Sequence, residues 1–273
     1  MTERIDAARN AILDRICQAA TRVHRDPADV EVVAITKTVA PERIRAAIDA
    51  GFRTLGENRV QERQAKAPEV DGLEAAPPTP AAIASAARRG LASTAERATG
   101  AGAALRASTV ADARVAWHLV GPLQSNKARR AIELFDVIET VDSVDLAERL
   151  GRIATELRPG RPLPVLLQVN VDLDAAKSGF EPEALERALP AILDVAGLSV
   201  DGLMTVGRLV DDPDAARPTF AALRRLSEAL RGRDARLGPA LSMGMSHDYP
   251  VAVEEGATFV RIGSAIFGAR PTG

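Results

Sequence analysis

The stretch VEVVAITKTVAPERI, residues 30–44, decides between the two α/β folds that suit a chain of this length. The apolar, largely β-branched run over 30–35 is typical of a buried strand, and Pro41 is placed to open a helix. Thr36, Lys37 and Thr38 stand between them. A doubly wound dinucleotide-binding sheet would carry a glycine-rich turn at this point. Because none is present, the stretch favours a (β/α)8 barrel.

Outward from this stretch, strand-like and helix-like segments alternate along most of the chain. We predict an N-terminal helix over residues 2–23, then eight strands, each followed by a helix or helical turn. The predicted strands cover 30–35, 54–56, 116–120, 137–141, 163–170, 198–205, 240–244 and 259–263. The pattern predicts an α/β chain with one domain over residues 1–273, a (β/α)8 TIM-like barrel with an extra N-terminal helix.

Polar residues mark the starts of several predicted helices. Ser125 is placed to cap the helix after the third strand, and either Asp142 or Ser143 to cap the helix after the fourth. Ser246, after the seventh strand, is suited either to cap the next helix or to bind an anion.

One segment breaks the alternation. Residues 67–113 are dominated by alanine, contain the run Pro77-Pro78-Thr79-Pro80 and lack large apolar side chains. Such a segment cannot build a core of its own. We therefore predict an insertion within the barrel domain, partly helical over 81–89, whose role the sequence leaves open.

The composition argues against several classes of protein. The formal net charge is −2 and aromatic residues make up 3% of the chain, so neither a nucleic-acid nor a membrane partner is expected. Cys17 is the single cysteine, and the N-terminus lacks the apolar segment of a signal peptide. The three histidines show no metal-ligand spacing. We expect a cytoplasmic protein without a metal site.

Lys37 is the only lysine that ends a predicted strand at the carboxyl face of the barrel, where barrel active sites lie. A strand-end lysine is often no more than a solvated charge. An amine shielded by apolar walls and neighbouring cations loses proton affinity, however, and can form a Schiff base with an aldehyde. The stretch alone leaves both interpretations open.

Small residues follow the last two predicted strands on the same face. Gly263 and Ser264 open the run GSAIFG, and Ser246 stands after the seventh strand. Backbone N–H groups in such loops suit a phosphate, although ordinary helix capping explains the same pattern. A phosphate site combined with a reactive amine matches the aldehyde and phosphate of pyridoxal phosphate (PLP).

Arg261 lies within the eighth predicted strand between Val260 and Ile262. Alternation directs its side chain away from the face of its apolar neighbours, into the barrel, where a cation needs a partner. A pyridine nitrogen and a carboxylate are both candidates.

At these residues the chain resembles the pyridoxal phosphate homeostasis family, whose barrel is similar to the N-terminal domain of alanine racemase. The resemblance rests on eight collinear motifs, and it covers nearly all of the chain outside the insertion. They are AITKT at 34–38, GENRVQE at 56–62, WHLVGPLQSNKAR at 117–129, VDSVDLAERL at 141–150, QVNVDLDAAKSGF at 168–180, GLMT at 202–205, LSMGMSHDY at 241–249 and VRIGSAIFGAR at 260–270.

The resemblance implies a set of cofactor-binding residues. Lys37 would carry PLP as a Schiff base, Asn58 would lie beside the ring, and Met204 would line the pocket. Arg261 would face the pyridine nitrogen. The phosphate would be held by Ser246, Gly263 and Ser264.

The same residues indicate what the protein does with PLP. Arginine stays protonated, so Arg261 would leave the pyridine nitrogen without a proton and make the ring a poor electron sink. Racemases of this fold add a tyrosine base from a second domain, whereas here the only tyrosine is Tyr249 and the chain ends at Gly273. The expected function is intracellular PLP and amino-acid homeostasis by a monomer without robust catalysis, with apo PLP-dependent enzymes as candidate recipients. The alternatives are a weak amino-acid racemase and a phosphate-binding barrel without cofactor.

Three positions depart from the family pattern or have no assigned role. Many relatives carry a basic residue two positions after the Schiff-base lysine, where this chain has Val39. His247 has no evident role. Lys177, in the KSGF stretch, is a candidate for the rim of the pocket, although a loop lysine needs no function.

Overall fold

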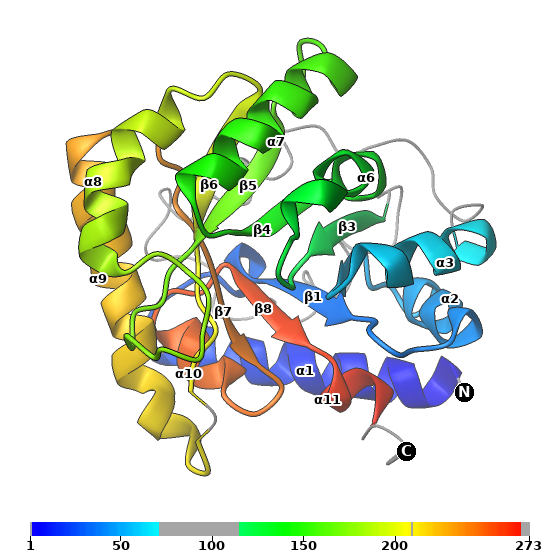
Figure 1. Cartoon of the computed structure of the whole chain (residues 1–273). Helices are drawn as coiled ribbons and strands as arrows, with labels where there is room; N and C mark the ends of the chain where they lie inside the picture. Colours follow the sequence, from blue (N-terminus) through cyan, green and yellow to red (C-terminus); the bar gives the residue numbers. More distant parts are fainter. Residues whose placement is uncertain (1, 71–114, 209, 269–273) are drawn as a thin grey trace.

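The structure, a computed structural model, describes residues 2–70, 115–208 and 210–268. Eight parallel strands close into a barrel in chain order, with β8 hydrogen-bonded to β1 (Figure 1). The strands are β1 Glu31–Ile35, β2 Thr54–Glu57, β3 Ala116–Leu119, β4 Val137–Val141, β5 Leu163–Gln168, β6 Leu198–Met204, β7 Ala240–Met245 and β8 Phe259–Ile262. The predicted (β/α)8 barrel is confirmed, and each predicted strand lies within two residues of an observed one at either end.

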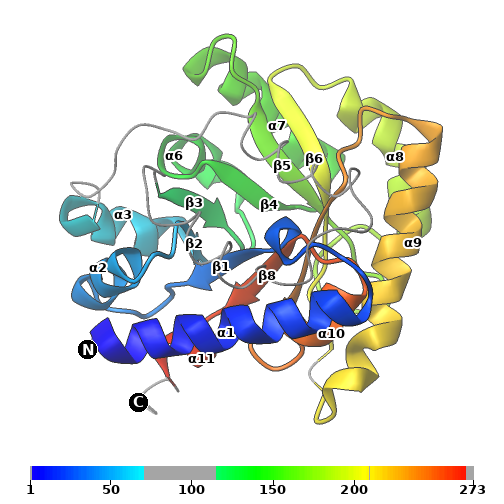
Figure 2. The same ribbon diagram turned by 180° about the vertical axis from the view of Figure 1, so that it is seen from behind.

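Helices surround the barrel. They are α1 Thr2–Arg22, α2 Pro41–Asp49, α3 Val60–Val70, α6 Ala128–Leu134, α7 Val144–Leu157, α8 Pro182–Leu193, α9 Arg217–Arg233, α10 Tyr249–Glu254 and α11 Ser264–Phe267. Three short 3-10 turns are η1 Pro27–Asp29, η3 Ser125–Lys127 and η4 Pro213–Ala216. The helix after β8 is the shortest, and the predicted N-terminal helix α1 packs against α2, α10 and α11 (Figure 2). Thus α1 fills the place in the outer layer that a long eighth helix would take.

Two apolar cores follow from the alternation of side chains along the strands. One lies between the strands and the helices and contains Val32 and Ala34 of β1. The other lies inside the barrel, where Val33 and Ile35 of β1 pack with residues of β5 to β8: Leu166, Met204, Ala240 and Phe259. At the same levels of the barrel, inward positions of four strands carry polar side chains: Arg261 pairs with Val33 and Ser242 with Met204.

The predicted caps are partly confirmed. Ser143 accepts a hydrogen bond from the backbone N–H of Leu146 at the start of α7 (3.3 Å). Ser125 is not a cap, because it lies inside η3 and no side chain caps α6. Ser246 does not cap α10 either; the N-cap position belongs to Asp248.

The predicted insertion begins later than expected. Residues 67–70 belong to α3, which continues through Pro68 to Val70. Pro68 is preceded by eight helical residues, so its missing N–H removes one backbone hydrogen bond near the end of the helix. The rest of the predicted insertion, residues 71–113, lies outside the described residues. The predicted helix over 81–89 is part of it.

Candidate functional site

Lys37 is the second residue after β1 and is half-buried. The next residue, Thr38, has a backbone φ of 60°, in the left-handed region that a β-branched residue rarely adopts. Its N–H donates to Glu62 Oε2 of α3 (3.3 Å), and its hydroxyl donates to the carbonyl of Lys37 (2.6 Å). Such a conformation costs about 1–3 kcal/mol and persists only where the surroundings impose it. The turn that presents Lys37 is therefore fixed by its neighbours.

A buried carboxylate supports the other side of this turn. Glu57 ends β2, and its Oε1 accepts hydrogen bonds from Thr36 Oγ1 (2.7 Å) and Lys66 Nζ (2.6 Å). Lys66 also donates to the carbonyl of Thr36 (2.7 Å). Burial raises the pKa of Glu57, and the hydrogen bond and charge of Lys66 offset part of the rise. Thus α3 holds both residues that flank Lys37, through Lys66 at Thr36 and through Glu62 at Thr38.

Sequence reasoning did not identify this support. A signal was present, because Glu62 and Lys66 are four residues apart and so lie on one face of α3. What the sequence does not contain is the packing of that face against the β1–α2 turn.

The loops after β7 and β8 bring backbone donors together as expected. The N–H groups of Gly263 and Ala265 both point at Ser246 Oγ, at 3.2 and 3.4 Å. One oxygen atom thus receives two backbone donors, as a phosphate oxygen would. Ser264 is exposed beside them, so its hydroxyl is accessible from the same side.

These donors lie next to the end of β1. Strands β8 and β1 are hydrogen-bonded neighbours, and Ala34 pairs with Ile262 in their register. A Cβ atom on Gly263 would stand 3.4 Å from Cβ of Ile35, two residues before Lys37. The candidate amine and the candidate phosphate donors therefore belong to adjacent strand ends of one barrel face.

Asn58 and Met204, the two residues expected to contact the cofactor ring or line its pocket, differ from each other in burial. Asn58 is half-buried after β2, and its backbone lies against Gly121 so closely that a Cβ there would be 2.2 Å from the carbonyl oxygen of Asn58. Glycine at 121 is thus required for this approach. Met204 is fully buried in the inner core, where it packs with Ile35 beneath the carboxyl face.

Arg261 points into the barrel, as the alternation predicts. Its Nη1 donates to Ser242 Oγ (2.6 Å), and its Nη2 donates to the carbonyl of Thr205 (2.7 Å). Nη1 also lies 4.0 Å from Glu139 Oε2, so a carboxylate stands close to the guanidinium. Burial lowers the pKa of Arg261, while the charges of Glu139 and Asp248 raise it. The group remains a cation, because arginine is effectively always protonated in proteins.

The polar contacts of Arg261 continue across the barrel. Ser242 Oγ lies 2.6 Å from Glu139 Oε2, and Glu139 Oε1 lies 2.6 Å from His118 Nδ1. The four side chains come from β3, β4, β7 and β8, and all are buried. They are not a serine hydrolase triad, because Glu139 stands between Ser242 and His118 and no base contacts the hydroxyl.

His118, Glu139 and Ser242 were not predicted as site residues. His118 and Ser242 each occupy an inward position between outward apolar neighbours, as His118 does between Trp117 and Leu119, whereas Glu139 is followed by the polar residue Thr140. The available signal is this run of polar residues at core positions of successive strands. It becomes visible only when the alternation of every strand is followed.

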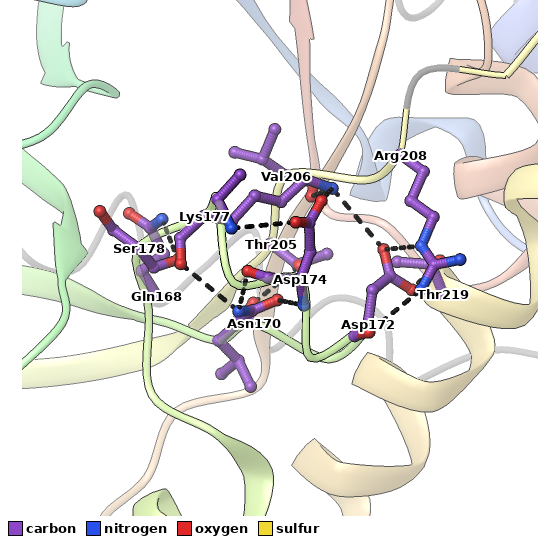
Figure 3. Close-up of polar contacts among 12 residues, drawn as sticks. Gln168, Asn170, Asp172, Asp174, Lys177, Ser178, Thr205, Val206, Arg208 and Thr219 are labelled. Carbon is purple, nitrogen blue, oxygen red and sulfur yellow. Dashed lines mark hydrogen bonds and ion pairs between the residues drawn. The ribbon is translucent and has the colours of Figure 1, made fainter.

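Lys177 lies at the rim, in the loop between β5 and α8 (Figure 3). Its Nζ donates to the carbonyl of Val206 (3.1 Å) and lies 3.7 Å from Asp172 and 3.8 Å from Asp174. Arg208 reaches Asp172 from the other side (3.6 Å). The lysine therefore ties the β5–α8 loop to the segment after β6, a structural role that a loop lysine need not have.

Two further residues can now be described. His247 is exposed, and its Nε2 lies 2.9 Å from the carbonyl of Asp211, in the loop before η4. Tyr249 is buried, with Arg15 of α1 over its ring (5.6 Å), and burial raises the pKa of its hydroxyl. The ring of Tyr249 is thus engaged in the contact between α10 and the N-terminal helix.

Two further features are absent from the part of the chain that the structure describes. No group of three or more histidine, cysteine, aspartate or glutamate side chains there is arranged to hold a metal ion. None of the described helices is both long enough and apolar enough to cross a membrane.

Comparison with known sequences identifies the family. Residues 9–271 match the family described as alanine racemase, N-terminal domain. A pyridoxal phosphate homeostasis protein of Pseudomonas aeruginosa is 37% identical over 262 residues, which cover 95% of this chain and 93% of the relative. The protein of the same name from Escherichia coli is 33% identical and covers 95% of this chain and 94% of its own length.

Solved structures agree with the sequence comparison. PipY of Synechococcus elongatus, solved without PLP and with PLP bound, is 36% identical to this chain, with a TM-score of 0.70. The match covers 94% of this chain and 100% of PipY. An alanine racemase of Clostridium difficile, 12% identical with a TM-score of 0.59, shares the fold over 95% of this chain and 57% of its own. The chain belongs to the pyridoxal phosphate homeostasis protein family, built on the alanine racemase N-terminal domain fold.

Proposed function

We propose that this chain binds PLP as a Schiff base on Lys37 and acts in intracellular PLP and amino-acid homeostasis without robust catalysis. The relatives from Pseudomonas aeruginosa and Escherichia coli are named for PLP homeostasis, and a third relative, PipY, was solved with PLP bound. The observation that supports the proposal is that the turn of Lys37 and the backbone donors of Gly263 and Ala265 follow two hydrogen-bonded neighbouring strands, β1 and β8.

The donor set fits the chemistry of PLP group by group. An aldehyde requires an amine, and Lys37 supplies one in a turn that its neighbours fix. A phosphate requires several N–H and O–H donors, and Gly263, Ala265 and Ser246 provide them together. A pyridine nitrogen requires a donor when it carries no proton, and Arg261 is a buried cation with N–H groups to spare.

When bound, PLP supplies an electrophilic aldehyde and an electron-withdrawing ring. Lys37 would hold the aldehyde through its amine in the neutral form. Asn58 would lie beside the ring, and Met204 would line the pocket. Arg261, which donates and cannot accept, would hold the pyridine nitrogen unprotonated, and this weakens the ring as an electron sink.

The position of Tyr249 also supports a role without robust catalysis. Racemisation needs two acid–base groups, one on each side of the reacting carbon. Tyr249 is the single tyrosine of the chain, and its buried ring packs under Arg15 of α1. We therefore propose apo PLP-dependent enzymes as recipients of the cofactor, and a monomer as the working form.

Absorption spectroscopy tests this function. The protein is incubated with PLP, freed of excess ligand, and scanned for the visible band of a protonated Schiff base. We expect the band in the wild type and in Lys127→Ala, and its loss in Lys37→Ala. Rapid turnover of alanine or serine by the wild type, lost in Lys37→Ala, would establish the racemase alternative instead. Absence of the band in the wild type would refute PLP binding through Lys37.

A further inference from the structure

A continuous polar chain crosses the barrel beneath the proposed cofactor site. It runs from His118 through Glu139 and Ser242 to Arg261 and ends at the carbonyl of Thr205. Each of its side-chain contacts is 2.6 or 2.7 Å long, and its four side chains are at most 6% exposed. None of the first three side chains has a role in the function proposed above.

The direction of each hydrogen bond follows from the chemistry of its groups. Arginine has no acceptor, so Arg261 Nη1 must donate to Ser242 Oγ. The hydroxyl proton of Ser242 is then directed at Glu139 Oε2, which accepts it. With Glu139 ionised, His118 Nδ1 must carry the proton that bonds to Oε1. The whole chain has one consistent arrangement of protons.

Charge balance depends on Glu139. Burial raises the pKa of its carboxyl, but the hydrogen bond and charge of His118, with Arg261 and Ser242, bring it below the ordinary value. Glu139 is thus an anion in the barrel interior that faces the cation of Arg261. Two further charged groups lie near the chain: Asp248, whose charge raises the pKa of Arg261, and Glu31, whose pKa the charge of His118 lowers.

The two anchors of Arg261 also fix its geometry. Nη1 is held by Ser242 and Nη2 by Thr205, so the plane of the guanidinium is set at two points. A planar group held in this way presents its remaining N–H groups in fixed directions. Removal of the anchor at Nη1 would leave the guanidinium free to rotate about the anchor at Nη2.

We propose that Glu139 is a positioning residue that acts through Ser242 to orient Arg261 and balance its charge, and so sets how tightly PLP is held. The inference rests on the proposed function, in which Arg261 faces the pyridine nitrogen. Glutamine at 139 cannot replace glutamate, because its amide has only one oxygen. The glutamine NH2 group would face either His118 or Ser242 in place of a carboxylate oxygen. The residue that faces it would then have to move its own proton, because two donors cannot form a hydrogen bond.

PLP titration of purified full-length variants tests this role. Glu139→Gln is compared with Ser242→Ala, which breaks the link but keeps the charge, and with Asp201→Asn. Asp201 is a matched control, because it is a partly buried carboxylate of β6 that accepts its hydrogen bond from Ser199 Oγ (2.5 Å) and not from Ser242 or His118. We expect PLP binding to weaken about tenfold in Glu139→Gln and in Ser242→Ala and to stay unchanged in Asp201→Asn.

A pH titration of the visible band separates positioning from general loss of structure. Without the anion at 139, the charge of Arg261 is uncompensated and disfavours a proton on the Schiff-base nitrogen of Lys37. The pH midpoint for loss of that proton should therefore fall in Glu139→Gln, and stay close to the wild-type value in Ser242→Ala. Partial recovery of binding is expected in Glu139→Asp.

Each result has a distinct meaning. No band in the wild type would refute the proposed function itself. A wild-type band with unchanged affinity and midpoint in Glu139→Gln would overturn the role of Glu139 alone. If Glu139→Gln fails to fold, Ser242→Ala decides, and wild-type affinity in that variant would equally overturn the inference.

Discussion

The two ends of the proposed PLP site are held by different kinds of interaction. At β1, the turn of Lys37 is fixed from outside the barrel by α3, through Lys66 and Glu62. At β8, Arg261 is fixed from inside the barrel by Ser242 of β7 and by the carbonyl of Thr205, directly after β6. Lys66 is 12% exposed at its side chain and Arg261 is 5% exposed. The position of Lys37 thus depends on the packing of α3, whereas the position of Arg261 depends on buried polar and charged groups.

This difference predicts unequal consequences of losing each cation. In Arg261→Met, Glu139 would remain as a buried anion without its nearby guanidinium. We expect the free energy of unfolding to fall by about 4 kcal/mol, measured by urea denaturation. Arg217→Met is the control, since Arg217 also contacts carboxylates, Glu254 (2.7 Å) and Glu255 (3.0 Å), but its side chain is 38% exposed. If the free energy of unfolding falls no more in Arg261→Met than in Arg217→Met, the β8 end of the site does not depend on buried charge, and the contrast with the β1 end is wrong.

Lys66→Met examines the other end, with a smaller expected effect. Glu57 would keep its hydrogen bond from Thr36 and lose its cation, and we expect a loss of about 2 kcal/mol at neutral pH. Arg59→Met provides the control, because Arg59 is 76% exposed and only 4.0 Å from Glu62. Lys66→Met should also bind PLP more weakly than the wild type, because the carbonyl of Thr36, next to Lys37, loses its hydrogen bond from Lys66.

The pH dependence of this loss has a definite sign. Burial raises the pKa of Glu57 above its ordinary value of 4.5, and loss of Lys66 raises it further. A carboxyl whose pKa is higher in the folded state than in the unfolded state lowers the free energy of unfolding as the pH rises from its unfolded-state pKa to its folded-state pKa. The difference in unfolding free energy between wild type and Lys66→Met should therefore be small near pH 4 and grow toward pH 7. A difference that is constant with pH would contradict the assignment to Glu57.

The smallest effect is expected for the loop between β5 and α8, which Lys177 holds. Lys177→Met removes a hydrogen bond to Val206 and two ion pairs at 3.7 and 3.8 Å, and its side chain is 22% exposed. We expect about 1 kcal/mol or less in unfolding free energy. Faster hydrogen exchange confined to residues 171–181 would show that the loop alone has loosened. Arg187→Met, at a 73% exposed position of α8, should leave exchange in that loop unchanged.

The sequence predicted the barrel well because each strand and helix carries its own local signal. Apolar runs, Pro41 and the cap Ser143 are read from a few neighbouring residues. The inward direction of Arg261 also followed from local alternation. Ser125 failed as a cap because η3 precedes α6, a local choice of backbone that composition does not determine.

The supports of the site were harder to predict because they join distant strands and helices. Glu139 and Ser242 are 103 residues apart in the chain and 2.6 Å apart in space. Likewise Lys66 reaches Thr36, 30 residues earlier, only because α3 packs beside β1. Alternation shows which residues face inward, but the closure of the barrel decides which of them meet. The residues named from the family resemblance for PLP itself stay predictions.

The central claim is that Lys37 is the amine that holds PLP. Borohydride reduction of the PLP-loaded protein, followed by peptide mass mapping, tests it most directly. The chain has four lysines, Lys37, Lys66, Lys127 and Lys177, so the peptides are easily told apart. We predict a pyridoxyl adduct on the peptide that contains Lys37, and its absence from Lys37→Ala. An adduct found on another lysine, with the Lys37 peptide unmodified, would contradict the account.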